Sequence, residues 1–125
     1  MEADLQDGGN RPVTAAAGGA LCPLADLAEG VPRGLTANSS EGPLEILVMR
    51  QGGRLVAYLN RCPHRGTPLD WAPDRFLAPD GAHFQCSTHG ARFRIADGYC
   101  VAGPCQGEQL RAVRLRVEDG MVRLA

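Results

Sequence analysis

Two short stretches of the chain each combine a cysteine with a histidine and end in glycine. The stretches are Cys62-Pro63-His64-Arg65-Gly66 and Cys86-Ser87-Thr88-His89-Gly90. Thiolate sulfur and imidazole nitrogen both bind metal ions in proteins. Together the stretches supply two sulfur and two nitrogen ligands from two segments of the chain. The predicted metal ligands are Cys62, His64, Cys86 and His89.

This ligand set fits two kinds of metal site. A single zinc ion takes two cysteines and two histidines in a closed, redox-silent tetrahedron. A Rieske [2Fe–2S] centre takes the two cysteines on one iron and the two histidines on the other. Structural zinc sites usually pair like ligands, as C-x2-4-C followed by H-x3-5-H. Here each stretch mixes them, as C-x-H and C-x-x-H, which gives one ligand to each of two metal atoms and favours the two-iron cluster.

The two stretches, taken with Gly103-Pro104, resemble the Rieske iron–sulfur family, specifically its soluble ferredoxin-type members. The similarity covers approximately residues 20–125. It implies one [2Fe–2S] cluster per chain. It also implies that the two cysteines hold the inner iron, and that His64 and His89 hold the outer, solvent-facing iron. Gly103-Pro104 matches the proline loop of the family, which covers the cluster from a third side.

The histidine ligands set the charge of the cluster and therefore its reduction potential. Two ferric ions, two sulfides and two thiolates carry no net charge, whereas four thiolates would make the core a dianion. Adding an electron to a neutral core costs less free energy. Rieske centres accordingly have potentials from about −150 to +300 mV, against roughly −400 mV for plant-type ferredoxins. Hydrogen bonds to the sulfurs set the value within that range.

The chain departs from the respiratory-complex branch of the family at four positions. That branch has a further cysteine in each ligand loop, and a serine and a tyrosine that donate hydrogen bonds to the cluster sulfurs. The corresponding residues here are Thr67, Thr88, Ala91 and Phe93. No disulfide between the loops can form, and neither side-chain donor is present. Because fewer donors stabilise the reduced state less, we expect a potential at the low end of the Rieske range.

The resemblance implies a soluble one-electron carrier and not an enzyme. The expected donor is a flavin- or NAD(P)H-linked reductase, and the expected acceptor is a Rieske-type oxygenase or another oxidoreductase. The sequence has no flavin or nicotinamide fingerprint and no 2-His-1-carboxylate set for a mononuclear iron. Two alternatives stay open. One is a small Rieske subunit of a larger oxidoreductase, similar to the small nitrite-reductase subunit, and the other is a cluster-based sensor or a structural zinc domain.

Length and composition predict one small β domain. The chain has 125 residues, with 16 glycines and 9 prolines, which is typical of short strands joined by many turns. The expected fold class is all-β, and the resemblance implies a Rieske-like fold of small antiparallel sheets with two cluster-binding loops and a proline loop. Residues 1–19 are predicted to be a flexible N-terminal extension, and residues 20–125 the Rieske domain. The net charge of −1 gives no support for nucleic-acid binding.

The sequence predicts a cytoplasmic protein. There is no apolar run of about 18 residues and no basic-then-apolar leader, so we expect neither a membrane span nor export. Five cysteines, two of them assigned to metal, favour a reducing compartment over a disulfide scaffold. We expect a monomer.

Apolar runs and glycine turns predict where the strands lie. Residues 44–49 and 55–59 read as two strands, with Gly52-Gly53 in the turn between them. The first ligand stretch follows the second of these strands directly. Residues 23–27 are expected to make a helical turn at the start of the domain.

Three further hairpins are predicted from turn residues. They lie around residues 79–81, Asp97-Gly98 and Asp119-Gly120. Before the last of these turns, Val113, Leu115 and Val117 alternate with arginines, which predicts a half-buried hairpin. Both ligand stretches are therefore expected at strand ends.

The remaining cysteines and the third histidine are interpreted as structural. Cys22, Cys100 and Cys105 are expected to be buried small residues rather than a disulfide or a redox relay. His83 lies in a predicted strand, three residues before Cys86. We expect its side chain to lie at the surface or to pair with a polar neighbour, and not to bind metal.

Overall fold

The computed structural model describes residues 20–39, 42–63, 66–70, 72, 74–86 and 90–125. The predicted flexible extension, residues 1–19, lies outside the described residues. So do two of the four predicted ligands, His64 and His89. The predicted ligands Cys62 and Cys86 are described.

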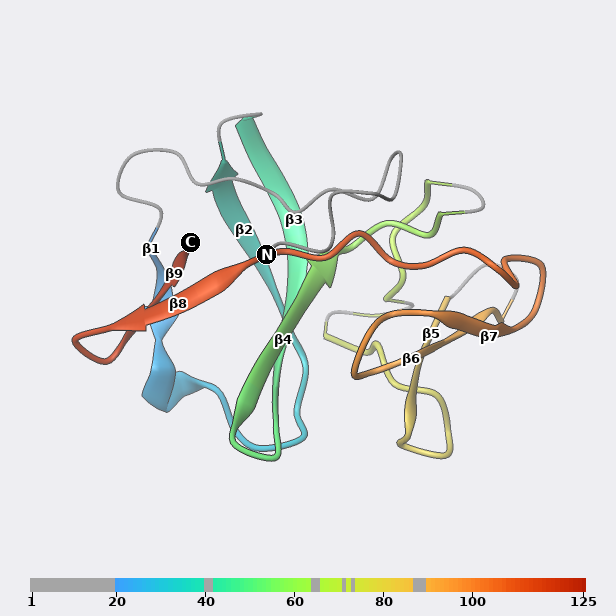
Figure 1. The fold of residues 1–125 in the computed structure, drawn as a ribbon, viewed down its shortest axis with the longest axis horizontal. Coiled ribbons are helices and arrows are strands. Elements are labelled where there is room, and N and C mark those ends of the chain that lie inside the picture. Colours follow the sequence, from blue (N-terminus) through green and yellow to red (C-terminus); the bar gives the residue numbers. More distant parts are fainter. Residues whose placement is uncertain (1–19, 40–41, 64–65, 71, 73, 87–89) are drawn as a thin grey trace.

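The described residues form three small antiparallel sheets, each with three strands (Figure 1). The central sheet, in the order β2-β3-β4, contains β2 (Arg33–Ser39), β3 (Gly42–Gln51) and β4 (Arg54–Leu59). The terminal sheet, in the order β1-β9-β8, contains β1 (Ala20–Pro23), β8 (Leu115–Glu118) and β9 (Met121–Leu124). The third sheet, in the order β5-β6-β7, contains β5 (His83–Gln85), β6 (Arg92–Arg94) and β7 (Cys100–Ala102). The expected all-β architecture of small antiparallel sheets is confirmed.

Three of the four hairpins predicted from turn residues join named strands, whereas the one around residues 79–81 pairs through the isolated antiparallel bridge Leu77↔Phe84. β3 pairs with β4 from Ile46↔Leu59 to Gln51↔Arg54, around Gly52-Gly53. Both glycines have positive φ, 59° and 79°, as a two-residue turn between strands of this twist requires. β6 pairs with β7 around Asp97-Gly98, and β8 pairs with β9 around Asp119-Gly120. The helical turn expected in residues 23–27 is a short 3-10 helix, η2 (Leu24–Asp26).

The last hairpin is less buried than its alternation predicts. Val113 is buried and Leu115 partly buried, but Val117 is 48% exposed. β8 is an edge strand of its sheet, and its far end extends away from the rest of the fold (Figure 1). The alternation therefore identifies the strand but not the extent of the core beneath it.

Strand β2 was not predicted, because its sequence carries little strand propensity. The segment is Arg-Gly-Leu-Thr-Ala-Asn-Ser, and glycine, alanine and asparagine are all depleted in strands. Pairing with β3 over seven residue pairs, from Arg33↔Val48 to Ser39↔Gly42, makes it a strand. Tertiary pairing here outweighs local preference.

The buried apolar residues of the described ranges, apart from Ala78, divide into two clusters on opposite faces of the central sheet. The site core comprises Leu47, Met49, Val56, Tyr58, Cys62, Leu69, Phe76, Phe84, Cys86, Ala91, Phe93, Ile95, Cys100, Cys105 and Leu110. The terminal core comprises Cys22, Leu27, Ala37, Ile46, Val48, Ala57, Leu59, Val113, Val122 and Leu124.

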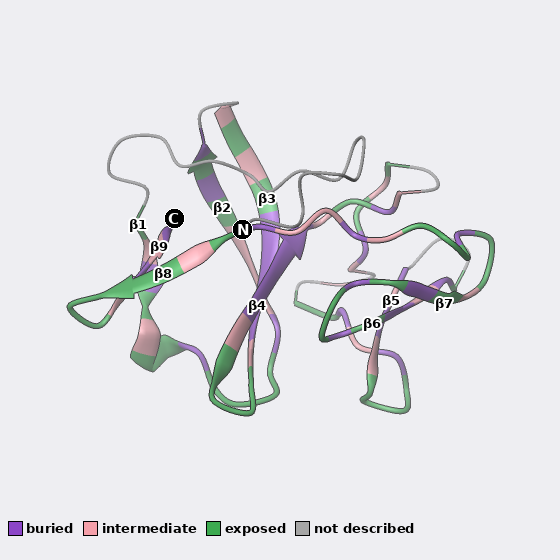
Figure 2. Cartoon of the chain, in the orientation of Figure 1, coloured by how far each residue is buried: buried purple, intermediate pink, exposed green. Residues whose placement is uncertain are grey.

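Strand β3 supplies side chains to both clusters. Leu47 and Met49 belong to the site core, whereas Ile46 and Val48 belong to the terminal core. Successive side chains of a strand point to opposite faces, and β4 alternates in the same way. All four β3 residues are buried, which gives the middle of the central sheet its buried colour on Figure 2. The central sheet thus anchors the third sheet to the remainder of the domain.

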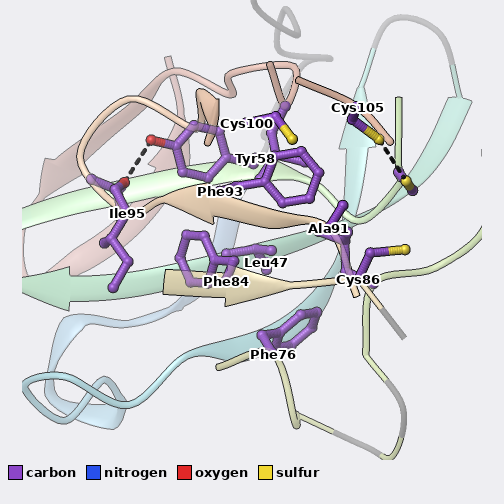
Figure 3. Packing of buried hydrophobic residues seen from close by; sticks show 14 of the residues in the cluster. Leu47, Tyr58, Phe76, Phe84, Cys86, Ala91, Phe93, Ile95, Cys100 and Cys105 are labelled. Atoms are coloured by element: carbon purple, nitrogen blue, oxygen red, sulfur yellow. Dashed lines mark hydrogen bonds between the residues drawn. The ribbon is translucent and has the colours of Figure 1, made fainter. Parts of the chain in front are cut away.

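Tyr58 ties β4 to the hairpin of β6 and β7. Its hydroxyl donates a hydrogen bond to the Ile95 carbonyl at 2.7 Å. Its ring packs edge-on against the ring of Phe84, with 5.9 Å between the two ring centroids (Figure 3). Burial raises the pKa of Tyr58 well above its ordinary value. Gly98 is required beside it, since a Cβ there would lie 2.8 Å from a ring carbon of Tyr58.

In the described part of the chain, no helix has the length and apolar character that crossing a bilayer requires.

Candidate metal centre

The first predicted ligand loop follows β4. The Cys62 side chain is 2% exposed. Its backbone N–H donates to the Thr67 carbonyl at 2.8 Å, and the Gly66 N–H donates back to the Cys62 carbonyl at 2.6 Å. Gly66 has a φ of 75°, a conformation that glycine adopts without the Cβ penalty of other residues.

The second predicted ligand loop follows β5 and repeats this hydrogen-bonding pattern. Cys86 is 1% exposed. Its N–H donates to the Ala91 carbonyl at 2.8 Å, and the Gly90 N–H donates to the Cys86 carbonyl at 3.1 Å. Gly90 has a φ of 68°. The sequence feature that corresponds to this repeated pattern is the spacing from cysteine to glycine, which is equal in the two loops. The spacing from cysteine to histidine differs between the loops and obscures the repeat.

The histidines occupy the part of each loop that lies between cysteine and glycine in the sequence. His64 and His89 are outside the described residues, so of the predicted ligand set the structure describes only the two cysteines. Within the described ranges alone, no group of three or more His, Cys, Asp or Glu side chains is arranged to hold a metal ion. Both cysteines belong to the site core.

The surroundings of the two cysteines fit an iron–sulfur cluster. Thiolates are soft ligands that suit such clusters, and Cys62 and Cys86 lie among buried aromatic and aliphatic side chains. An apolar, water-excluding environment penalises net charge. A core with two thiolates and two neutral imidazoles carries no charge when oxidised, and so suits this environment better than a four-thiolate dianion.

The predicted proline loop packs directly on the second ligand loop. Gly103 follows β7 and has a φ of 91°. A Cβ on Gly103 would lie 2.7 Å from the Cα of Ala91, closer than real Cβ contacts come. Ala91 itself is fully buried. The close approach explains why both positions carry the smallest side chains, and it places Gly103-Pro104 beside the loop that contains Cys86.

A third thiol lies beside the first ligand loop, and this position of the thiol was not predicted from the sequence. Cys105 is fully buried, as expected, but its Sγ lies 3.6 Å from the Sγ of Cys62. The neighbouring Cys100 thiol donates to the Ala102 carbonyl at 3.2 Å. The pKa of the Cys100 thiol is raised, because burial raises it more than the hydrogen bonds with Ala102 and Cys105 lower it. The available signal was position, because Cys105 directly follows the proline-loop motif.

His83 pairs with a polar neighbour, as predicted. Its Nδ1 lies 2.8 Å from Oδ2 of Asp80, and Arg92 approaches the same carboxylate at 3.6 Å. The pKa of Asp80 is lowered, first by the hydrogen bond from the Ala82 N–H and then by His83. His83 is therefore part of a polar network with Asp80 and Arg92 at the turn before β5.

Comparison with known proteins identifies relatives of this architecture. The family model described as the Rieske [2Fe-2S] domain matches residues 19–117. No curated protein matches the chain. The ferredoxin of carbazole 1,9a-dioxygenase from Nocardioides aromaticivorans IC177 has a similar structure, with a TM-score of 0.65 and 25% identity over 85% of this chain and 94% of that one.

Two further solved structures show the same similarity. The Sphingomonas yanoikuyae B1 ferredoxin gives a TM-score of 0.63 with 28% identity, over 84% of this chain and 94% of that one. The terminal oxygenase of carbazole 1,9a-dioxygenase from Novosphingobium sp. KA1 gives a TM-score of 0.67 with 27% identity, over 84% of this chain but 28% of that one. The similarity therefore extends over nearly all of each ferredoxin and over one part of the oxygenase.

Proposed function

Because the chain belongs to the family of Rieske [2Fe–2S] domains, we propose that it carries single electrons from a flavin- or NAD(P)H-linked reductase to a Rieske-type oxygenase. Its cofactor is one [2Fe–2S] cluster, and it is an electron-transfer protein rather than an enzyme. The family assignment sets aside a structural zinc domain. We further propose that residues 20–125 form the cluster domain after a flexible extension, 1–19, in a cytoplasmic monomer.

The proposed ligands are Cys62 and Cys86 on the inner iron and His64 and His89 on the outer iron. The observation that carries this assignment is the matched pair of loops, in which each cysteine makes the same two backbone hydrogen bonds and is at most 2% exposed. Equivalent turns present the two thiols from two strand ends to one apolar cluster. The residues between cysteine and glycine in each loop include the histidines, which would face the partner.

The distribution of exposed apolar side chains supports a free carrier over a permanently bound subunit. Among the described residues, the large apolar side chains that are exposed are Val31, Tyr99, Val101 and Val117. They belong to separate segments, apart from Tyr99 and Val101 near β7. Permanent interfaces need a large contiguous apolar patch. Scattered residues of this kind suit the brief contacts of an electron carrier.

The proposed function predicts a low Rieske potential and one-electron delivery. Ala91 and Phe93 are fully buried apolar side chains, so neither donates to a sulfur. The midpoint potential, measured by protein-film voltammetry, should lie in the lower half of the range from about −150 to +300 mV. In anaerobic stopped-flow mixing, an oxidised Rieske-type oxygenase from the same organism should reoxidise the dithionite-reduced protein with one electron per chain.

The control for this experiment is mixing with buffer that lacks the oxygenase, in which the reduced protein should stay reduced. A potential near −400 mV would contradict the mixed ligand set, because that value is typical of four-thiolate clusters. Absence of electron delivery to the oxygenase would contradict the proposed acceptor while leaving the cluster assignment intact.

A further inference from the structure

The third thiol of the site core lies next to a proposed cluster ligand. Cys105 follows Gly103-Pro104 in the proline loop, and its Sγ is 3.6 Å from the Sγ of Cys62, within hydrogen-bonding distance for two sulfurs. Figure 3 draws this contact as the dashed line from Cys105. Both residues are at most 2% exposed, and neither of them forms a disulfide. The contact joins residues 43 positions apart in the sequence, from the proline loop to the first ligand loop.

Only one of these two sulfurs can donate the hydrogen bond once the cluster is bound. A cysteine that binds iron does so as a thiolate and has no proton to give, whereas Cys105 carries an S–H, a weak donor. We propose that the Cys105 thiol donates a hydrogen bond to the ligand sulfur of Cys62 and thereby raises the reduction potential of the cluster. Cys105 acts through Cys62, and is therefore a positioning residue.

The neighbouring thiol does not compete for this role. Cys100 donates its own proton to the Ala102 carbonyl at 3.2 Å. Cys105 also contacts Cys100, but a neutral sulfur is a weaker acceptor than an anionic one. The single proton of Cys105 is therefore drawn to the Cys62 sulfur. Water has little access to this contact, because Cys62 is 2% exposed and Cys105 is fully buried.

The direction of the effect follows from charge. Reduction adds one negative charge to the cluster, and this charge is shared with the sulfur ligands. A donor to a ligand sulfur stabilises the more negative state, so it raises the potential. The effect is strengthened by the low dielectric of the site core. Cys105 would thus supply, from the proline loop, part of the hydrogen bonding that Ala91 and Phe93 cannot supply from the second loop.

The test compares the midpoint potentials of Cys105→Ala and Cys105→Ser with that of the wild-type holoprotein. Cys105→Ala removes the donor and is expected to disfavour reduction about tenfold, which is about 59 mV to lower potential for one electron. Cys105→Ser keeps a donor and should hold the potential at or above the wild-type value. The matched control is Cys22→Ala, a buried cysteine of the terminal core, which should leave the potential unchanged.

If Cys105 had only a structural role, both variants would have a lower melting temperature but the same midpoint potential as each other. Equal midpoint potentials in the wild type, Cys105→Ala and Cys105→Ser would overturn the proposal. Infrared spectroscopy gives a second readout. The S–H stretching band that Cys105→Ala removes should move to lower frequency when the wild-type cluster is reduced, and a band that does not move would also overturn it.

Because Cys62 is an iron ligand only under the function proposed above, each sample is also analysed for iron and for its EPR signal. A Cys105→Ala variant that carries two irons per chain and a Rieske-type signal, but has the wild-type potential, refutes the role of Cys105 alone. A wild-type protein without a two-iron cluster refutes the proposed function itself.

Discussion

The Cys86→Ala variant is expected to contain no [2Fe–2S] cluster, and so is Cys62→Ala. Each substitution removes one of two thiolates on the same iron, and alanine offers no replacement ligand. Both side chains are almost fully enclosed by the site core, so water has little access to the open position. Iron content per chain and visible absorption of the purified variants measure the loss directly.

The control for this experiment is Cys22→Ala. Cys22 is also buried, at 7% exposed, but it lies in the terminal core, on the other face of the central sheet. Burial raises the pKa of its thiol, an effect that Arg33 partly offsets. Cys22→Ala should retain the full iron content. Wild-type iron content in Cys86→Ala would contradict the ligand assignment.

The second large effect is expected from Gly103→Ala, which should destabilise the domain by about 2–6 kcal/mol. A left-handed backbone conformation at a non-glycine residue costs about 1–3 kcal/mol, and Gly103 has a φ of 91°. The new Cβ would also lie 2.7 Å from the Cα of Ala91. Because that neighbour is backbone, the contact is relieved only by moving one loop, at about 1–3 kcal/mol. Urea denaturation of the holoprotein measures the change.

Gly107→Ala separates the two contributions. Gly107 has nearly the same φ, 93°, but no heavy atom lies within 4 Å of the position its Cβ would take. It should therefore show the backbone cost alone. Gly103→Ala should in addition lose its visible absorption faster on dilution into a chelator, since the proline loop is displaced from the second ligand loop. Equal stability losses and equal bleaching rates in the two variants would show that the close approach of Gly103 to Ala91 is unimportant.

Features of the fold that depend on a few adjacent residues were predictable from sequence. The turns at Gly52-Gly53, Asp97-Gly98 and Asp119-Gly120 each join paired strands, because the conformation of a tight turn is decided by its own two residues. Strand β2 (Arg33–Ser39) was not predictable in this way, since its seven pairs with β3 are formed between whole strands.

In the candidate site, too, the features set by adjacent residues were predictable and the contacts between distant segments were not. The cysteine and glycine of each ligand loop are four residues apart, and both loops have the predicted location at a strand end. The contact between Cys105 and Cys62, and that between Gly103 and Ala91, were not predicted. Both bring together residues from separate loops through the folding of the β6–β7 hairpin onto the site core. The residue types at positions 103 and 105 indicate small, buried residues, but they do not indicate which residues of the other loops lie beside them.

The central claim is that two cysteines and two histidines of this chain bind one two-iron cluster. It is tested most directly by pulsed EPR of the dithionite-reduced protein, prepared with and without ¹⁵N-labelled histidine, together with iron and zinc analysis. The account predicts two irons per chain, no zinc, and hyperfine coupling to two histidine nitrogens that changes with the label. An EPR-silent protein with one zinc per chain, or a reduced cluster without histidine coupling, would contradict it.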